Sequence, residues 1–180
     1  SYALFAETIL QIKSANGRAG FIVPTGIATD DSTKLFFGHI SQSGQLAALY
    51  SFDNEKFIFP AVHHSFRFAL VTLGTTSSAD LLFYAQRVSE LSDERKHFSL
   101  STSDFHLINP NTLTCPTFRS RRDAEITKKL YRAAPVLMRD PVFEELPGGK
   151  HLVEPGQNPW GIKFSTMFHM SNDSHLFAYE

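Results

Sequence analysis

Apolar residues in the first forty positions follow a helical pattern, then a strand pattern, then a helical pattern again. Spacings of three and four predict an amphipathic helix over residues 3–14. The apolar run GFIVP at residues 20–24 is typical of a strand buried on both faces of a parallel sheet. Side-chain oxygens at residues 29–32 then favour a capped helix over residues 33–41. Helix, strand and helix in this order indicate an α/β fold.

From residue 45 the pattern is mainly that of strands, which we expect at residues 46–52, 57–59, 65–73 and 81–84. The third of these is the most informative, because both faces that it would present are mostly apolar. Phe68 and Leu70 lie on one face, and Val71 lies on the other. Such a strand needs cover on both sides, so we expect it in the interior of the sheet.

Beyond residue 88 the chain is more polar and less regular, with one helix expected over residues 123–134 and loops near residues 148–149 and 155–159. We therefore divide the chain into an α/β portion, residues 1–95, and a loop-rich portion, residues 96–180. The first portion begins with a helix and has no opening strand with a glycine-rich turn. We expect it to be the later part of a larger domain.

The composition is that of a folded chain, because 42% of the 180 residues are hydrophobic and 17 are Phe. No stretch approaches the roughly 18 consecutive apolar residues of a membrane-spanning helix, and the N-terminus lacks the pattern of a secretory signal. Cys115 is the only cysteine, so an internal disulfide is impossible and a metal site built from cysteines is not expected. We expect a cytoplasmic location.

The net charge of −1 hides a basic segment. Residues 119–139 contain seven basic and two acidic residues, a net charge of +5, whereas the remaining ten basic and sixteen acidic residues give −6. A local positive charge of this kind suits the phosphate backbone of a nucleic acid. A solvated helix face would show the same pattern, and this alternative stays open.

Most motifs of catalysis and cofactor binding are missing. Neither Gly17-Arg18-Ala19-Gly20 nor Gly148-Gly149-Lys150 completes a glycine-rich phosphate loop, and there is no Gly-x-Ser-x-Gly motif. The eight histidines invite a metal site. However, His63 and His64 would point to opposite faces of a strand, so we expect no metal.

One string carries a resemblance to a known family. Residues 17–31, GRAGFIVPTGIATDD, closely resemble the segment that follows the catalytic Asn-Pro-Pro-aromatic loop in large adenine-specific DNA methyltransferases. These are the methylase subunits of type IIG-like restriction-modification and phage-exclusion systems. Strings similar to this family recur along nearly the whole chain, at residues 59–62, 66–73, 109–112, 118–124 and 168–177.

The resemblance implies a fold and a reaction. Residues 1–95 would be the later half of a class I, S-adenosylmethionine-dependent methyltransferase sheet, which is Rossmann-like, and residues 96–180 would start a loop-rich α+β DNA-recognition region. The implied reaction transfers a methyl group to N6 of an adenine flipped out of double-stranded DNA. The cofactor loop and the catalytic loop have no match here. We expect both, and most of the S-adenosylmethionine site, before Ser1 of a parent chain, and we expect the segment alone to be inactive.

The resemblance also implies residues of the base pocket. In the family, an aromatic side chain on the strand after the Phe-Pro turn packs against the flipped base, which makes Phe68 and Phe66 the candidates here. Both would also fit a hydrophobic core. Pro24, Thr25 and Gly26 follow a predicted strand, at the end where open α/β sheets bind ligands, and we expect them to line the pocket.

The candidates for binding DNA lie in the basic segment. Arginine can hold a phosphate or read guanine, and a serine hydroxyl can donate to a phosphate oxygen. The expected residues are Arg119, Ser120, Arg121, Arg122, Lys128, Lys129 and Arg132. Two alternative functions stay open: a non-catalytic DNA-binding or specificity module, and a methyltransferase that acts on RNA or another substrate.

Overall fold

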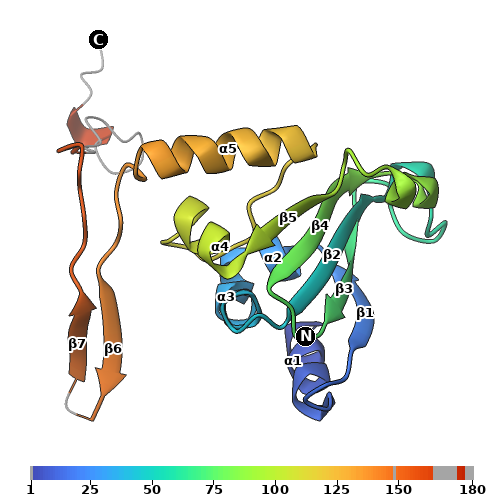
Figure 1. Cartoon of the computed structure of the whole chain (residues 1–180), viewed down its shortest axis with the longest axis horizontal. Helices are drawn as coiled ribbons and strands as arrows, with labels where there is room; N and C mark the ends of the chain where they lie inside the picture. Colours follow the sequence, from blue (N-terminus) through green and yellow to red (C-terminus); the bar gives the residue numbers. More distant parts are fainter. Residues whose placement is uncertain (1, 148, 164–173, 177–180) are drawn as a thin grey trace. The chain divides into compact units, whose positions relative to one another are not determined.

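The computed structural model describes residues 2–147, 149–163 and 174–176, and the chain divides into two compact units, residues 1–136 and 137–180. The first unit is a mixed α/β structure built on one sheet (Figure 1). Its helices are α1 (Tyr2–Ile12), α2 (Gly26–Thr29), α3 (Lys34–Gln42), α4 (Thr102–Ile108) and α5 (Arg121–Ala133). Its strands are β1 (Ala19–Pro24), β2 (Leu46–Asp53), β3 (Arg67–Leu73), β4 (Ser78–Ala85) and β5 (Phe98–Ser101).

The five strands lie in the order β1-β3-β2-β4-β5. β3 is antiparallel to both β1 and β2, and β4 is parallel to β2. Therefore β1, β2 and β4 run in the same direction, and their carboxyl ends meet at one edge of the sheet. β5 pairs with β4 in the antiparallel sense. The expected strand over residues 65–73 is confirmed as β3, which has a neighbour on each side.

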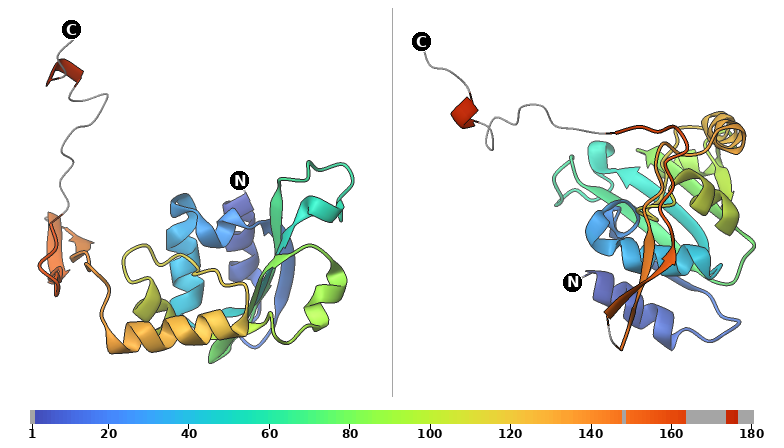
Figure 2. Two further views of the ribbon diagram at one scale, coloured as in Figure 1. Left: turned by 90° about the horizontal axis from the view of Figure 1, so that it is seen from above. Right: turned by 90° about the vertical axis from the view of Figure 1, so that its left-hand side faces the viewer.

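One face of the sheet carries the main hydrophobic core. Side chains such as Leu49, Val71 and Leu81 alternate into this core, and each helix from α1 to α5 contributes a buried residue. Figure 2 shows the helices of this unit beside the sheet. Burial of this apolar surface is the main stabilising contribution to such a fold. The helices expected over residues 3–14, 33–41 and 123–134 are confirmed as α1, α3 and α5.

A smaller apolar cluster lies on the other face. Its buried members are Phe52, Leu82 and Ala85, against which Phe68 and Leu91 pack. Leu91 belongs to the 3₁₀ helix η3 (Val88–Ser92), so the segment after β4 folds back over this face. The face is covered by loops and short turns, whereas the main core is covered by helices.

The prediction of a short strand over residues 57–59 is wrong. The 3₁₀ helix η2 (Asn54–Lys56) occupies the preceding positions, and Phe57 has a positive φ of 50°. The buried Asn54 amide donates to the carbonyls of Phe59 (3.0 Å) and Val62 (2.8 Å) and accepts from the Phe59 N–H (3.0 Å). One buried side chain thus satisfies three backbone groups and folds the segment into a loop.

The strand expected over residues 20–24 exists as β1, but its predicted environment is wrong. Among the described residues β1 pairs with β3 only, in the antiparallel sense, and so lies at an edge. Phe21 and Val23 enter the main core, whereas Ile22 is 53% exposed. Alternation along the strand separates these side chains, although all of them are apolar.

The capping predicted before α3 is also wrong. The polar residues at 29–32 end α2 and form the 3₁₀ helix η1 (Asp31–Thr33). No side chain caps α3 at its first residue. Instead, the Thr33 hydroxyl donates to the carbonyls of Gly26 (2.7 Å) and Asp30 (3.0 Å), which ties α3 to the turn after β1.

The second unit contains the antiparallel pair β6 (Val142–Leu146) and β7 (Gly149–Glu154). Arg139 pairs with Glu154 at 2.7 Å beside these strands.

The predicted division at residue 95 falls inside the first unit, just before β5. As a division of function it stays a prediction. Residues 168–173 and 177, part of one family-like string, lie outside the described residues. In the part of the chain that is described, no helix has the length and apolar character needed to cross a membrane.

Candidate functional site

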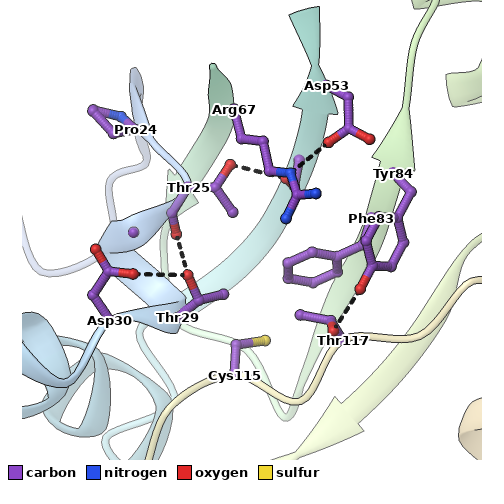
Figure 3. A pocket seen from close by; sticks show the side chains of 12 residues that line it. Pro24, Thr25, Thr29, Asp30, Asp53, Arg67, Phe83, Tyr84, Cys115 and Thr117 are labelled. Carbon is purple, nitrogen blue, oxygen red and sulfur yellow. Dashed lines mark hydrogen bonds and ion pairs between the residues drawn. The ribbon is translucent and has the colours of Figure 1, made fainter. Parts of the chain in front are cut away.

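A cavity of about 470 Å³ opens at the carboxyl ends of β1, β2 and β4 (Figure 3). Open α/β sheets bind ligands outside the carboxyl ends of their parallel strands, and the volume is within the usual range of small-molecule sites. The lining combines hydroxyl groups, an ion pair, aromatic rings and a thiol. Its members are Pro24, Thr25, Gly26, Thr29, Asp30, Ser51, Asp53, Arg67, Phe83, Tyr84, Cys115 and Thr117.

The structure places Pro24, Thr25 and Gly26 on the wall formed by the end of β1. The buried Thr25 Oγ1 lies 2.9 Å from Ser51 Oγ of β2, and the Thr25 N–H donates to the Arg67 carbonyl at 3.2 Å. Gly26 packs closely against Asp30, because a Cβ at Gly26 would lie 2.3 Å from Asp30 Oδ2 in the observed conformation of that side chain. The carboxylate of Asp30 therefore occupies the space that the missing side chain leaves.

An ion pair next to Thr25 forms a further part of the wall. Arg67, the first residue of β3, places its Nε 2.9 Å from Asp53 Oδ1 at the end of β2. Asp53 Oδ1 accepts no well-aligned hydrogen bond, so the contact is electrostatic. The Arg67 side chain is 59% exposed, whereas that of Asp53 is 18% exposed. The pair thus presents a guanidinium toward solvent and keeps a carboxylate in the wall.

A β-bulge brings two consecutive residues of β4 into the cavity. Tyr50 of β2 pairs with Leu82, but Phe52 pairs with Ala85, so Phe83 and Tyr84 together face a single residue. Consecutive strand residues normally point to opposite faces. A bulge changes this direction and is often found next to functional sites. Here it allows the rings of both Phe83 and Tyr84 to line the cavity.

Tyr84 is the most constrained residue of the site. Its φ of 63° lies in the left-handed region, which bulky side chains rarely adopt. Its hydroxyl lies 2.9 Å from Thr117 Oγ1, and the guanidinium carbon of Arg119 lies 4.7 Å from its ring centroid. Sequence reasoning did not select Tyr84, because no residue of β4 signals the bulge.

Cys115 lines the cavity as a neutral group. Its N–H donates to the Ala28 carbonyl at 2.7 Å, which fixes the segment before Thr117 against α2. The thiol is buried, and this burial strongly raises its pKa. Because the thiolate is the nucleophilic form of cysteine, this environment favours a packing role.

Phe66 and Phe68 are not among the residues that line this cavity. The Phe68 ring stacks on Phe52 (centroids 5.3 Å apart) and meets Phe59 edge-on at 4.8 Å, within the smaller apolar cluster. Phe66 is 61% exposed in the loop before β3. A role of either ring against a base stays a prediction.

The structure separates the seven predicted DNA-binding residues into two groups. Four of them make hydrogen bonds or ion pairs within the protein. Ser120 caps α5 through Asp123, and Arg121 donates to the His97 carbonyl. Lys128 pairs with Glu125 and donates to the Ser99 carbonyl, and Arg132 pairs with Asp104. The other three, Arg119, Arg122 and Lys129, are exposed and make no hydrogen bond or ion pair with the described residues. Arg119 lies on Tyr84 beside the cavity, and Arg122 and Lys129 lie on α5.

The two adjacent histidines lie in a loop, so the strand geometry expected for them is wrong. Their ring centroids are 4.3 Å apart. His63 Nδ1 lies 2.8 Å from Ser65 Oγ, and His64 Nδ1 lies 3.2 Å from Glu55 Oε1. Within the described ranges, no group of three histidine, cysteine or carboxylate side chains is arranged to hold a metal ion.

The turn after β1 lacks the glycine-rich sequence of a nucleotide-binding loop. Nucleotide-type cofactors of doubly wound folds lie against a glycine-rich turn, where the backbone approaches the ligand closely. The turn after β1 has one glycine, and the space above it holds the Asp30 carboxylate.

No protein-family model matches the chain, and no curated protein matches it. Among solved structures, the fold is similar to a chain from work on the complex assembly and conformational transition of a type I restriction-modification system, with 11% sequence identity and a TM-score of 0.48. The similarity covers 73% of this chain, which spans 36% of the length of that chain.

Proposed function

We propose that this chain is part of a site-specific DNA adenine-N6 methyltransferase of a restriction-modification system, and that its cavity receives the adenine flipped out of the duplex. One observation carries the proposal. The string at residues 17–31, which resembles the family most closely, forms β1 and the turn that lines the cavity at the carboxyl ends of three parallel strands.

The chemistry of the cavity suits a planar base. Bases extruded by DNA-modifying enzymes are held by stacking on flat apolar groups and by hydrogen bonds to their polar edge. Phe83 and Tyr84 supply aromatic surface, the hydroxyl groups of Thr25 and Ser51 lie on the wall, and the Asp53 carboxylate offers an acceptor.

Exposed cations of the first unit suit the rest of the nucleic acid. Arg119 lies on a ring that lines the cavity, whereas Arg122 and Lys129 are exposed on α5. Such side chains supply the phosphate contacts that give DNA affinity its dependence on salt. In this proposal S-adenosylmethionine is held by other residues of the parent protein. The segment alone would therefore bind DNA without methylating it.

A cavity-blocking variant tests the proposal. Thr29 is exposed at the rim and donates to the carbonyl four residues earlier, so Thr29→Trp fills the opening without removing a core side chain. Thr8→Trp is the matched control, because Thr8 is also exposed and also donates to the carbonyl four residues earlier, on α1.

The measurement is binding to duplexes in which one adenine or one thymine faces an abasic site, so that extrusion costs little. We expect the wild type and Thr8→Trp to prefer the unpaired adenine roughly tenfold or more, about 1.4 kcal/mol. Thr29→Trp should lose this preference and keep its affinity for paired DNA. Equal binding of both duplexes by the wild type would overturn the proposed pocket, and would favour the alternative of a DNA-binding module without a base pocket.

A further inference from the structure

We propose that Tyr84 is a positioning residue that holds the Arg119 guanidinium at the rim of the cavity, where Arg119 clamps a phosphate next to the extruded base. This inference rests on the proposed function. It distinguishes Arg119 from the other cations, because Arg119 is the predicted DNA-binding residue whose side chain lies on a cavity-lining ring.

The contact with the ring leaves the donors of Arg119 available. The guanidinium carbon lies 4.7 Å from the ring centroid, a distance at which the cation is attracted to the ring, and among the described residues the guanidinium has no hydrogen-bond or ion-pair partner. The N–H groups of a guanidinium form a planar fork that matches two phosphate oxygens. The ring therefore restricts the motion of the side chain without using the atoms that would bind phosphate.

The backbone of Tyr84 is built to fix this ring. The bulge and the left-handed φ of 63° turn the side chain away from the direction that β4 would otherwise give it. The hydroxyl is held by Thr117, two residues before Arg119, so the hydroxyl and the ring of Tyr84 contact the same segment. Such strain persists where the surrounding structure requires it, and it is concentrated at functional sites.

Arg67 does not provide the same function. Its guanidinium carbon is 5.9 Å from the Tyr84 centroid, but its Nε is paired with Asp53. A cation neutralised by a carboxylate in the same wall gains less from a phosphate. Among the described residues, this leaves Arg119 as the guanidinium on the ring that carries an uncompensated charge.

The test is the salt dependence of DNA binding by the chain. Each phosphate contact contributes about −0.9 to the slope of log affinity against log salt concentration. Arg119→Ala should make this negative slope shallower by about 0.9, and Tyr84→Leu should make it shallower by a similar amount. The slope of the double variant should be no shallower than that of either single variant. Tyr84→Phe keeps the ring and should keep the slope.

Matched variants separate positioning from a general loss of structure. Arg122→Ala removes an exposed cation that does not contact Tyr84, so its effect on the slope should add to that of Tyr84→Leu. Tyr84→Gly removes the ring from a backbone that glycine adopts easily, and it should match Tyr84→Leu. An unchanged slope for Arg119→Ala, or additive effects of Arg119→Ala and Tyr84→Gly, would overturn the inference.

The outcome is distinguishable from failure of the proposed function. If the coupling between Tyr84 and Arg119 is found but an unpaired adenine is not preferred over thymine, the phosphate clamp stands and the base pocket fails. If the preference for adenine is found without the coupling, the pocket stands and the clamp fails.

Discussion

A single backbone angle determines what the end of β4 presents to the cavity. With an ordinary strand conformation, Tyr84 would face the smaller apolar cluster together with Leu82. The positive φ and the bulge place it beside Phe83 instead, with its hydroxyl on Thr117. The cost of the left-handed conformation is about 1–2 kcal/mol for a residue other than glycine. The contacts of the ring offset part of this cost.

This strain predicts an unusual order of stabilities. Without the ring, glycine at position 84 should be more stable than alanine by about 1 kcal/mol, because only glycine adopts this φ freely. At Tyr131, which lies within the helix α5, the order should reverse: Tyr131→Ala should be more stable than Tyr131→Gly by a similar amount. Urea unfolding of the four variants would measure both differences. A more stable Tyr84→Ala than Tyr84→Gly would show that residue 84 is not held in the left-handed conformation.

At the scale of elements, the cations of α5 stabilise the first unit more than the sequence suggested. Arg132 pairs with Asp104 at 2.9 Å, and Lys128 donates to the Ser99 carbonyl of β5. Asp104 also accepts from the N–H and the hydroxyl of Ser101 at the start of α4. Periodicity predicted the helix, but it could not show which cations have partners within the protein. Three of the lysine and arginine residues expected on DNA, Arg121, Lys128 and Arg132, therefore join α5 to its neighbours.

Asp104 makes this connection sensitive to acid. Burial opposes ionisation of Asp104, but the hydrogen bonds from Ser101 and the charges of Lys128 and Arg132 outweigh it and lower the pKa of its carboxyl. A lowered pKa in the folded state means that the stabilisation is present above the unfolded value, about 3.9, and is lost as the pH falls through the folded value.

Asp104→Asn should therefore reduce the free energy of unfolding near pH 7 by about 1–3 kcal/mol, since it weakens a cap and leaves Arg132 unpaired. The difference from the wild type should shrink as the pH falls well below 4. Glu7→Gln, on the exposed face of α1, is the control and should change little. Denaturant midpoints across this pH range provide the measurement, and a difference independent of pH would contradict the assigned role of Asp104.

At the scale of the whole molecule, the sequence predicted the class of fold and the edge at which a cavity should form. Apolar periodicity located three of the helices, and the rule for carboxyl ends of parallel strands led to residues 24–26. The bulge in β4, the loop held by Asn54 and the hairpin of β6 and β7 were not predicted. The bulge depends on a backbone angle that no residue type requires, and the loop depends on one buried side chain that satisfies three backbone groups. The two strands of the hairpin are exposed along their whole length, so they lack the alternation of buried and exposed residues that predicts a strand.

The central claim concerns the base that is modified, and it is tested most directly by the methylated nucleosides in genomic DNA. The parent protein that contains this chain would be expressed in a host that lacks adenine methylation, and the hydrolysed DNA would be analysed by mass spectrometry. We predict N6-methyladenine with the wild type and with Thr8→Trp, and a loss of at least tenfold with Thr29→Trp. Methylated cytosine in place of adenine, or no methylated base from a folded protein that binds DNA, would contradict the assignment.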